Sequence, residues 1–185
     1  MRVIAGTARS IPLKTPKGEQ TRPTTDRIKE TLFNMINQDI AGSVFLDLFS
    51  GSGGIGIEAL SRGAAKAYFV EKDTEACNCI KENIYKCRFT DNSVLLKQDA
   101  SAAIMSSIKE HADIIFMDPP YNLDLEKKIL DLLSRSSIID SDSVIIIEAL
   151  IDNDFSYAET FGYEIIKEKL YKTNKHVFLK KKECV

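Results

Sequence analysis

The sequence predicts an α/β domain in which a mostly parallel β-sheet is covered by helices on both faces. From Val44 to Ala149, short apolar runs of strand length alternate with segments of helical periodicity. A glycine-rich turn connects the first of these strands to its helix, as in folds that bind ligands at the carboxyl ends of their strands. The two closing runs, 163–169 and 175–181, have no helix-length segment between them, so they must pair antiparallel.

The N-terminal segment is predicted to form a small extension of this domain. Residues 1–21 contain two short apolar runs that prolines restrict to edge strands or a hairpin. A helix is predicted from about 25 to 37, with Thr24 or Thr25 as its N-cap. The apolar face of this helix consists of Ile28, Leu32, Met35 and Ile36.

The first strand, turn and helix of the main domain span residues 44–62. The mostly apolar run 44–48 predicts a buried strand, and helical periodicity follows over 54–62. Between them, Gly51, Gly53 and Gly56 match the pattern GxGxxG, which allows positive φ and close approach of a ligand to the main chain. A ligand bound there meets the positive end of a helix.

Two carboxylates near this turn narrow the class of ligand that it would bind. Asp47 ends the apolar strand just before the turn, where an ionised carboxylate is costly unless a cation or a hydrogen-bond donor meets it. Glu71 ends the next apolar run, 20 residues after Gly51, where an acid typically binds ribose hydroxyls. The pair favours a nucleoside that carries an ammonium or sulfonium group over a dinucleotide.

The later elements continue the alternation and bring more polar groups to the same edge. Strands are predicted at 66–70, 94–97, 113–117 and 144–149, and helices at 74–87, 100–109 and about 124–134. Asp99 follows the third strand and could accept from an adenine amine, cap the next helix, or do both. Asp118-Pro-Pro-Tyr121 follows the fourth strand; its prolines remove two N–H donors and leave acceptors that suit an amino group, beside a tyrosine on which a base could stack.

Composition sets the broad class. A chain of 185 residues with 44% apolar residues can form one domain with a real core, and no apolar run is long enough to span a membrane. We therefore expect a soluble, cytoplasmic protein that works as a monomer. Its four cysteines, Cys77, Cys79, Cys87 and Cys184, have neither C-x-x-C spacing nor histidine partners, so no metal site and no disulfide framework is expected.

The net charge of −2 conceals two basic ends. Residues 1–30 carry a net charge of +4, residues 31–163 carry −10, and residues 164–185 carry +4. If the ends meet in space, they form a cationic face that could neutralise phosphates, although the last lysines could equally be a solvated tail. Arg22 and Arg27 oppose the dipole of the predicted helix at its start, which favours a role with a ligand.

The motifs together carry a family resemblance. Asp-Pro-Pro-Tyr with Asp-Leu-Phe-Ser-Gly-Ser-Gly resembles the amino-group branch of the S-adenosylmethionine-dependent methyltransferases. Arg-Val-Ile-Ala-Gly, Arg-Pro-Thr-Thr-Asp-Arg and Glu-Thr-Leu-Phe-Asn near the N-terminus are similar to the RsmD family, which methylates N2 of a guanine in 16S ribosomal RNA. The likeness covers nearly the whole chain. It implies a Rossmann-like class I methyltransferase fold, with a seven-stranded mixed sheet, helices on both faces and a small N-terminal hairpin and helix. The implied division is an RNA-contacting extension, 1–38, and a methyltransferase domain, 39–185.

The resemblance also implies roles for individual residues. The cofactor, S-adenosylmethionine, would be bound by Asp47, Ser50, Gly51, Gly53, Gly56, Glu71, Lys72, Asp99 and Ala100. Asp118 and the Pro119 carbonyl would hold the target amine, with Tyr121 against the base. The basic N-terminal segment would hold phosphates of 16S rRNA, in an assembling 30S particle, through Arg9, Arg22, Thr24 and Arg27. One departure is Gly54-Ile, where the family commonly has Ala-Leu.

Three alternatives remain open at this stage. N6-adenine or another amino methylation of DNA or a different RNA would keep the chemistry, but such DNA enzymes often append a base-recognition domain for which this chain has no room. A nucleotide-dependent oxidoreductase could use the same glycine turn but would have no use for Asp118-Pro-Pro-Tyr. A non-catalytic RNA-binding module would not need Asp47, Glu71 and Asp118 together.

Overall fold

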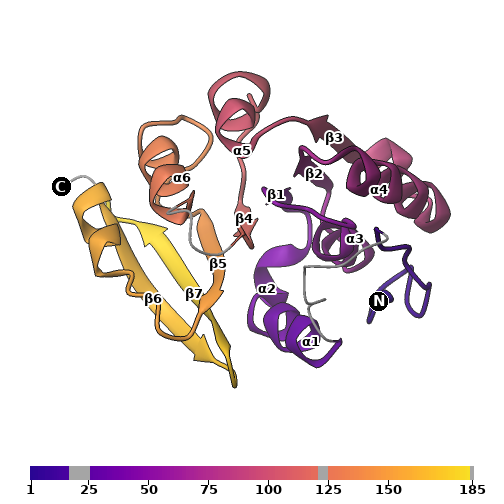
Figure 1. Cartoon of the computed structure of the whole chain (residues 1–185), viewed down its shortest axis with the longest axis horizontal. Helices are drawn as coiled ribbons and strands as arrows, with labels where there is room; N and C mark the ends of the chain where they lie inside the picture. The colour runs from indigo at the N-terminus through magenta and orange to yellow at the C-terminus, as the bar shows by residue number, and fades with distance from the viewer. Residues whose placement is uncertain (17–25, 121–124, 184–185) are drawn as a thin grey trace.

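The computed structural model describes residues 1–16, 26–120 and 125–183 and contains one seven-stranded β-sheet with helices on both faces (Figure 1). The strands are β1 (Val44–Asp47), β2 (Lys66–Glu71), β3 (Ser93–Lys97), β4 (Ile114–Met117), β5 (Val144–Leu150), β6 (Tyr163–Leu170) and β7 (Asn174–Lys181). The helices are α1 (Asp26–Met35), α2 (Asn37–Ile40), α3 (Gly54–Ser61), α4 (Thr74–Cys87), α5 (Ala100–Ala102) and α6 (Leu125–Ser134). Three short helical turns complete the set: η1 (Thr90–Asn92), η2 (Ala103–Ser107) and η3 (Ser156–Phe161).

The strand order is β3-β2-β1-β4-β5-β7-β6. The first five strands are parallel, and β7 runs antiparallel to both β5 and β6. Both the parallel sheet and the antiparallel closing pair were predicted, and both are confirmed. The chain moves outward in one direction from β1 to β3 and then returns to β4, so the strand order reverses between β1 and β4. In open α/β sheets, ligands bind outside the carboxyl ends of the strands at this reversal.

Two apolar cores lie on the two faces of the sheet. Helices α1 to α4 cover one face, and α5 and α6 cover the other (Figure 1). The parallel strands are buried on both faces, which explains their nearly continuous apolar sequences. By contrast, every residue of β6 after Tyr163 is exposed, because this strand forms an edge of the sheet.

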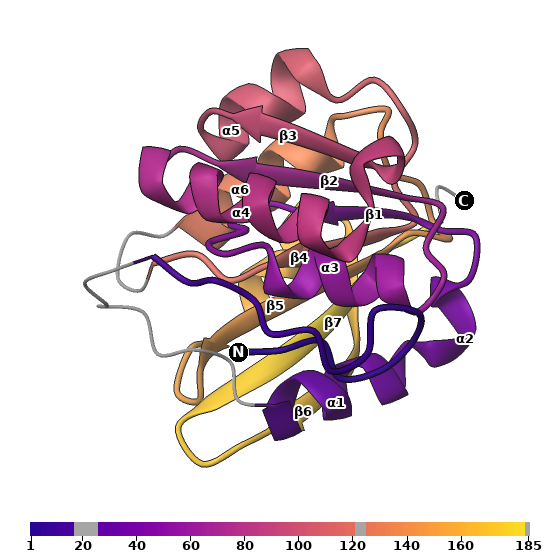
Figure 2. The same ribbon diagram turned by 90° about the vertical axis from the view of Figure 1, so that its right-hand side faces the viewer.

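The N-terminal segment packs along α3 rather than joining the sheet (Figure 2). It folds back on itself through an antiparallel bridge between Arg2 and Pro12, so the expected hairpin is confirmed in a minimal form. Glu58 of α3 is fully buried and accepts from the backbone N–H groups of Ile4 at 2.8 Å and Ala5 at 3.0 Å. The same carboxylate pairs with Lys29 of α1 at 3.2 Å, so one side chain ties three segments together.

Two predicted helices differ from those observed. The helix expected over 25–37 ends at Met35, because Ile36 has φ −109° and ψ 14° and α2 then begins as a separate turn. Its buried face also includes Lys29 and Phe33, because Glu58 compensates the charge of the lysine. The helix expected over 100–109 is a single α-helical turn followed by the π-helical turn η2, in which the Ser106 hydroxyl donates to the Ala102 carbonyl.

Candidate active site

The glycine turn and the Asp118 loop lie at the same edge of the sheet. β1 and β4 are adjacent and parallel, with Asp47 opposite Phe116, so the segments that follow both strands emerge side by side. The Leu48 N–H donates to the Phe116 carbonyl at 3.0 Å, which extends the pairing beyond the last residue of β1. The two motifs on which the sequence argument depends are therefore neighbours.

The glycine turn has the geometry that its sequence predicts. Gly51 and Gly53 have φ values of +52° and +79°, which side-chain-bearing residues rarely adopt. The Gly53 N–H donates to the Ser50 carbonyl at 2.7 Å, and the Ser50 hydroxyl donates to the Asp47 carbonyl at 2.8 Å. Gly56 serves packing, since a Cβ there would overlap the ring of Phe69.

Gly54 lies against the N-terminal residue. A Cβ at this position would overlap the sulfur of Met1, but that sulfur is near the end of a flexible side chain, which can shift. The Ser52 hydroxyl also contacts that sulfur, at 3.6 Å. The structure therefore gives no reason for glycine rather than alanine at 54.

Glu71 connects the end of β2 to the glycine turn. One carboxylate oxygen accepts from the Gly51 N–H at 2.9 Å. The other accepts from the N–H groups of Lys72 at 2.8 Å and Asp73 at 2.9 Å. These three donors fix a partly exposed acid beside the turn, which is where a ribose-binding acid was expected, while the Lys72 side chain is exposed.

Asp47 is the most deeply buried acid of the site. Its side chain is 1% exposed; one oxygen accepts from the Gly56 N–H at 3.2 Å, and the other has no hydrogen-bond partner among the described residues. Burial raises the pKa of this carboxyl to about 7, and the nearby Glu71 acts in the same direction. A buried acceptor with no partner is costly unless a ligand donates to it or places positive charge beside it.

Asp99 caps the short helix that follows β3. Its carboxylate accepts from the Ser101 N–H at 2.9 Å. Partial burial acts to raise the pKa of this exposed acid, but hydrogen bonds from Ser101 and Ala102 outweigh it and leave the pKa below its usual value. The capping role is confirmed, and Ala100 beside it is buried. An adenine contact by either residue stays a prediction.

Asp118 lies directly after β4, partly buried, and is followed by the buried Pro119. Burial and the nearby carboxylates of Glu148, Asp47 and Glu126 raise its pKa well above the usual value of an aspartate. Tyr121, expected to face the base, lies outside the described residues.

A polar group that the sequence reasoning missed adjoins Asp118 on the next strand. Glu148, near the end of β5, receives hydrogen bonds from Asn174 at 2.6 Å and from His176 at 3.1 Å. The signal for Glu148 was present in the sequence, because it is an acid within an apolar strand, as Asp47 is. The signal for His176 was not, since an isolated histidine in a strand gives no information on its partner.

The residues assigned to RNA are not all at this edge. Arg9 is exposed and lies near the far end of α3, where Thr7 and Ala8 donate to Ser61 at 2.8 and 2.9 Å. The first turn of α1 with Arg27 lies instead beside the start of the chain, where Asp26 pairs with Arg2 at 2.9 Å and the neighbouring Met1 contacts Ser52 of the glycine turn at 3.6 Å. Arg22 and Thr24 fall outside the described residues.

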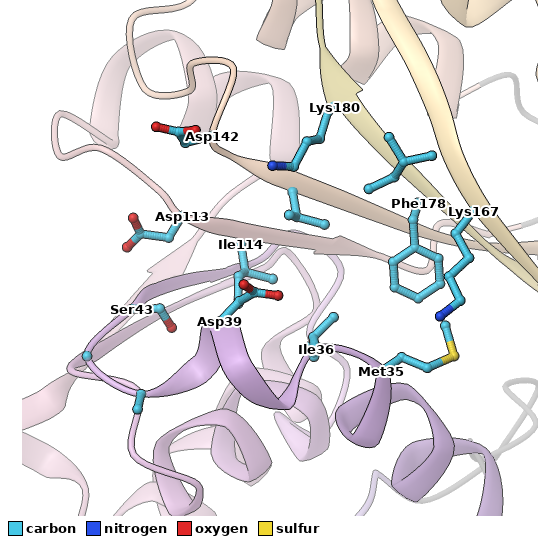
Figure 3. Close-up of a pocket in the computed structure, with 14 residues that line it drawn as sticks. Met35, Ile36, Asp39, Ser43, Asp113, Ile114, Asp142, Lys167, Phe178 and Lys180 are labelled. Atoms are coloured by element: carbon cyan, nitrogen blue, oxygen red, sulfur yellow. The ribbon is translucent and has the colours of Figure 1, made fainter.

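A cavity of about 410 Å³ lies at the opposite edge of the sheet (Figure 3). It is bordered by the ends of α1 and α2, by the amino ends of β1 and β4, and by the hairpin of β6 and β7. Asp39, Asp113 and Asp142 line it together with Lys167 and Lys180. None of the predicted site residues borders it.

The described part of the chain shows neither a metal cluster nor a membrane-spanning helix. Within residues 1–16, 26–120 and 125–183, no cluster of three or more histidine, cysteine or acidic side chains could hold a metal ion. Cys77, Cys79 and Cys87 are buried and free. Among the same residues, no helix has the length and apolar character needed to cross a bilayer.

Comparison with known proteins agrees with this geometry. A family model described as conserved hypothetical protein 95 matches residues 1–180. Ribosomal RNA small subunit methyltransferase D of Haemophilus influenzae is 34% identical over 171 residues, covering 91% of this chain and 88% of its own length. The Escherichia coli protein of the same name is 33% identical over 153 residues, covering 83% of this chain and 76% of its own.

Solved structures show the same fold. The Escherichia coli protein yhhF superposes with a TM-score of 0.86 at 29% identity, covering 98% of both chains. A second structure, from Haemophilus influenzae, gives a TM-score of 0.82, also at 29% identity and 98% coverage of both chains.

The sheet order, the glycine turn beside Asp47 and Glu71, and the acid that follows β4 define a Rossmann-like class I methyltransferase. Such enzymes use S-adenosylmethionine. Within this class, the chain belongs to the ribosomal RNA small subunit methyltransferase D family, the RsmD family.

Proposed function

We propose that this enzyme transfers a methyl group from S-adenosylmethionine to the exocyclic N2 amine of a guanine in 16S ribosomal RNA. The observation that carries the proposal is the juxtaposition of the glycine turn after β1 with the acid after β4. The substrate is the one that the names of the curated relatives indicate, namely small-subunit ribosomal RNA. A substrate inside an assembling 30S particle, a cytoplasmic location and a monomeric enzyme belong to the same proposal.

The cofactor side of the site fits a cationic nucleoside. The Asp47 oxygen that lacks a partner offers a buried negative acceptor beside the glycine turn. Gly51 and Gly53 leave the main chain of the turn free of side chains, and Glu71 is fixed beside it for ribose hydroxyls. The adenine would lie near Asp99 and Ala100, while Ser50, Gly56 and Lys72 complete the proposed cofactor set.

On the substrate side of the site, the attacking group is the exocyclic amine of guanine, which is a poor nucleophile. The lone pair of an exocyclic guanine amine is delocalised into the ring. Acceptors that hold the amine hydrogens localise that lone pair and aim it, and we assign this role to the Asp118 carboxylate and the Pro119 carbonyl, which directly follow β4. The bound cofactor supplies a methyl group that its sulfonium has already activated, so alignment and charge placement dominate the rate. Tyr121 is assigned to the face of the base.

The raised pKa of Asp118 suits this role. Because of its burial and of the nearby Glu148, Asp47 and Glu126, this carboxylate accepts a proton more readily than an ordinary aspartate. The amine must lose one proton as it gains the methyl group, and Asp118 is the nearest acceptor that the proposed arrangement offers.

The test is the Asp118→Asn variant, assayed on small-subunit particles from a strain that lacks this methylation. The amide keeps the shape of the side chain but cannot accept a proton as a base. We expect the single-turnover rate to fall at least about a hundredfold, in the range typical of a lost general base. S-adenosylmethionine affinity, measured by calorimetry, should stay within about threefold of wild type. A variant with normal turnover would refute the role of Asp118.

A further inference from the structure

Asp118 is the first member of a row of polar side chains that crosses three strands. In the register of β4 and β5, Met117 lies opposite Ile147, so the next pair along both strands is Asp118 and Glu148. In the register of β5 and β7, Glu148 lies opposite His176. Because adjacent strands lie about 4.8 Å apart and these positions share one face of the sheet, the three side chains are consecutive neighbours.

The far end of this row is held by a chain of hydrogen bonds. The Tyr171 hydroxyl lies 3.1 Å from His176 Nδ1, and His176 Nε2 lies 3.1 Å from a Glu148 oxygen. The Asn174 amide donates to the other Glu148 oxygen at 2.6 Å. Burial and Glu148 raise the pKa of Tyr171 to about 12, so its hydroxyl keeps its proton. When Nε2 of a neutral His176 donates to Glu148, Nδ1 accepts from the Tyr171 hydroxyl.

The centre of this chain, His176 and Glu148, is buried. The His176 side chain is fully buried, and Glu148 is 5% exposed. The rings of Phe116 and Tyr171 contact the imidazole edge to face, with centroids 6.2 and 5.1 Å away. Apolar side chains would fill this space at a lower cost than a carboxylate and an imidazole, which suggests that the charge of Glu148 is retained for a purpose other than packing.

The position of Glu148 indicates what this charge does: it lies beside Asp118 and increases the affinity of that carboxylate for a proton. The titratable groups that face Asp118 in the described structure are Asp47 on β1, Glu126 on α6 and Glu148 on β5, with His176 behind Glu148. Glu148 is the strongest of the three carboxylate contributions. Each of its two oxygens is held by a hydrogen bond, one to Asn174 and one to His176, which orients the carboxylate on this face of the sheet.

We propose that Glu148 is a positioning residue for methyl transfer, fixed by Tyr171, His176 and Asn174 so that its negative charge makes Asp118 a stronger proton acceptor. This inference rests on the proposed function. As the amine nitrogen forms its bond to the methyl carbon, the carbon–sulfur bond breaks and its electron pair stays on sulfur. The proton released from nitrogen passes to the Asp118 carboxylate, whose affinity for it is increased by the adjacent charge.

The test is the pH dependence of the single-turnover rate for wild type and for Glu148→Gln, with enzyme and S-adenosylmethionine in excess over undermodified small-subunit particles. Glutamine keeps the shape of Glu148 and removes its charge. We expect the acidic limb of the profile to move to lower pH by about one unit, with a plateau reduced about threefold or more, since a weaker base accepts the proton less readily. Glu148→Asp should return the limb toward its wild-type position, and Glu164→Gln, on the exposed β6, should not move it.

A purely structural role predicts a different result. Loss of packing would lower the rate at every pH and leave the acidic limb where it was, which would overturn the proposal. If wild type is active and the limb does not move, only the role of Glu148 fails, whereas an inactive wild type contradicts the proposed function itself.

A second measurement follows the titration of Asp118 directly. The side-chain carboxyl of Asp118 is labelled with ¹³C in wild type and in Glu148→Gln, and its signal is identified by its loss in Asp118→Asn. A lower pKa of Asp118 in Glu148→Gln than in wild type supports the proposal, and an unchanged pKa overturns it.

Discussion

At the scale of single residues, Asp47 shows that a binding site can cost stability. Its carboxyl is buried, with one oxygen lacking any partner in the described structure, and its pKa is raised to about 7 from 3.8. Between these two values the folded protein holds a proton that the unfolded chain has lost. The free energy of unfolding therefore falls as pH rises from about 4 to about 7, and the site is least favourable where the enzyme must work.

The variant Asp47→Asn tests both the loss of stability that this buried charge causes and its role in cofactor binding. Asparagine can still accept from the Gly56 N–H but carries no charge. Without its ligand, the variant should be more stable than wild type at pH 8, by about 1 to 3 kcal/mol, and the difference should vanish near pH 4. Thermal denaturation across this range measures both effects.

The same variant should bind S-adenosylmethionine at least about tenfold more weakly at pH 8, a loss of about 1.4 kcal/mol. Wild-type affinity should weaken as pH falls below about 7, whereas that of the variant should not depend on pH. A variant that loses stability and keeps its affinity would show that Asp47 is a structural residue.

At the scale of elements, Glu58 determines how the N-terminal segment docks. This carboxylate of α3 accepts from the N-terminal backbone, pairs with Lys29 of α1 at 3.2 Å and receives a hydrogen bond from Arg62 at 2.8 Å. Burial lowers the pKa of Lys29, and Glu58 partly offsets this effect. A buried lysine without its partner would be an uncompensated charge.

Glu58→Gln should therefore destabilise the protein by about 3 to 5 kcal/mol, as expected when one partner of a buried ion pair is removed. Lys29→Met in the same chain should recover part of that loss, because it removes the stranded charge. The free energy of unfolding in urea gives all values of this double-mutant cycle. Additive effects of the two substitutions would show that the pair is not coupled.

The elements also show what sequence can and cannot predict here. Periodicity predicted the strands and most helices, because burial on both faces of a parallel sheet leaves continuous apolar runs. It missed the burial of Lys29, since the compensating Glu58 is distant in sequence and only tertiary packing brings the two together. Asp47, Glu71 and Asp118 could be placed because each ends a strand at the same edge, whereas the partners of Glu148 come from β7 across the sheet.

At the scale of the whole molecule, the basic ends of the chain are not equivalent. The N-terminal segment and the hairpin of β6 and β7 lie on different sides of the protein (Figure 1). Two lysines of the C-terminal part pair with acids of the chain itself, Lys175 with Glu168 at 2.7 Å and Lys182 with Glu159 at 2.6 Å. The first turn of α1, near the glycine turn, is therefore the better candidate for a phosphate contact close to the target base.

This difference predicts unequal effects of two arginine substitutions. Arg27→Ala should weaken binding to the ribosomal particle. It should also reduce the slope of log affinity against log salt concentration by about one, because one fewer counterion is released. Arg9→Ala, at the far end of α3, is the matched control and should have a smaller effect. Equilibrium binding between 50 and 200 mM salt measures both, and equal losses would contradict the placement of RNA along the carboxyl edge.

The most direct test of the account is to identify the nucleoside that the enzyme makes. The protein is incubated with labelled S-adenosylmethionine and small-subunit particles that lack this modification, and the digested RNA is analysed by chromatography and mass spectrometry. The account predicts that the label appears in N2-methylguanosine, at one site in 16S ribosomal RNA, and disappears with Asp118→Asn. Label in N6-methyladenosine, or none in the RNA while the wild-type protein binds the cofactor, would contradict it.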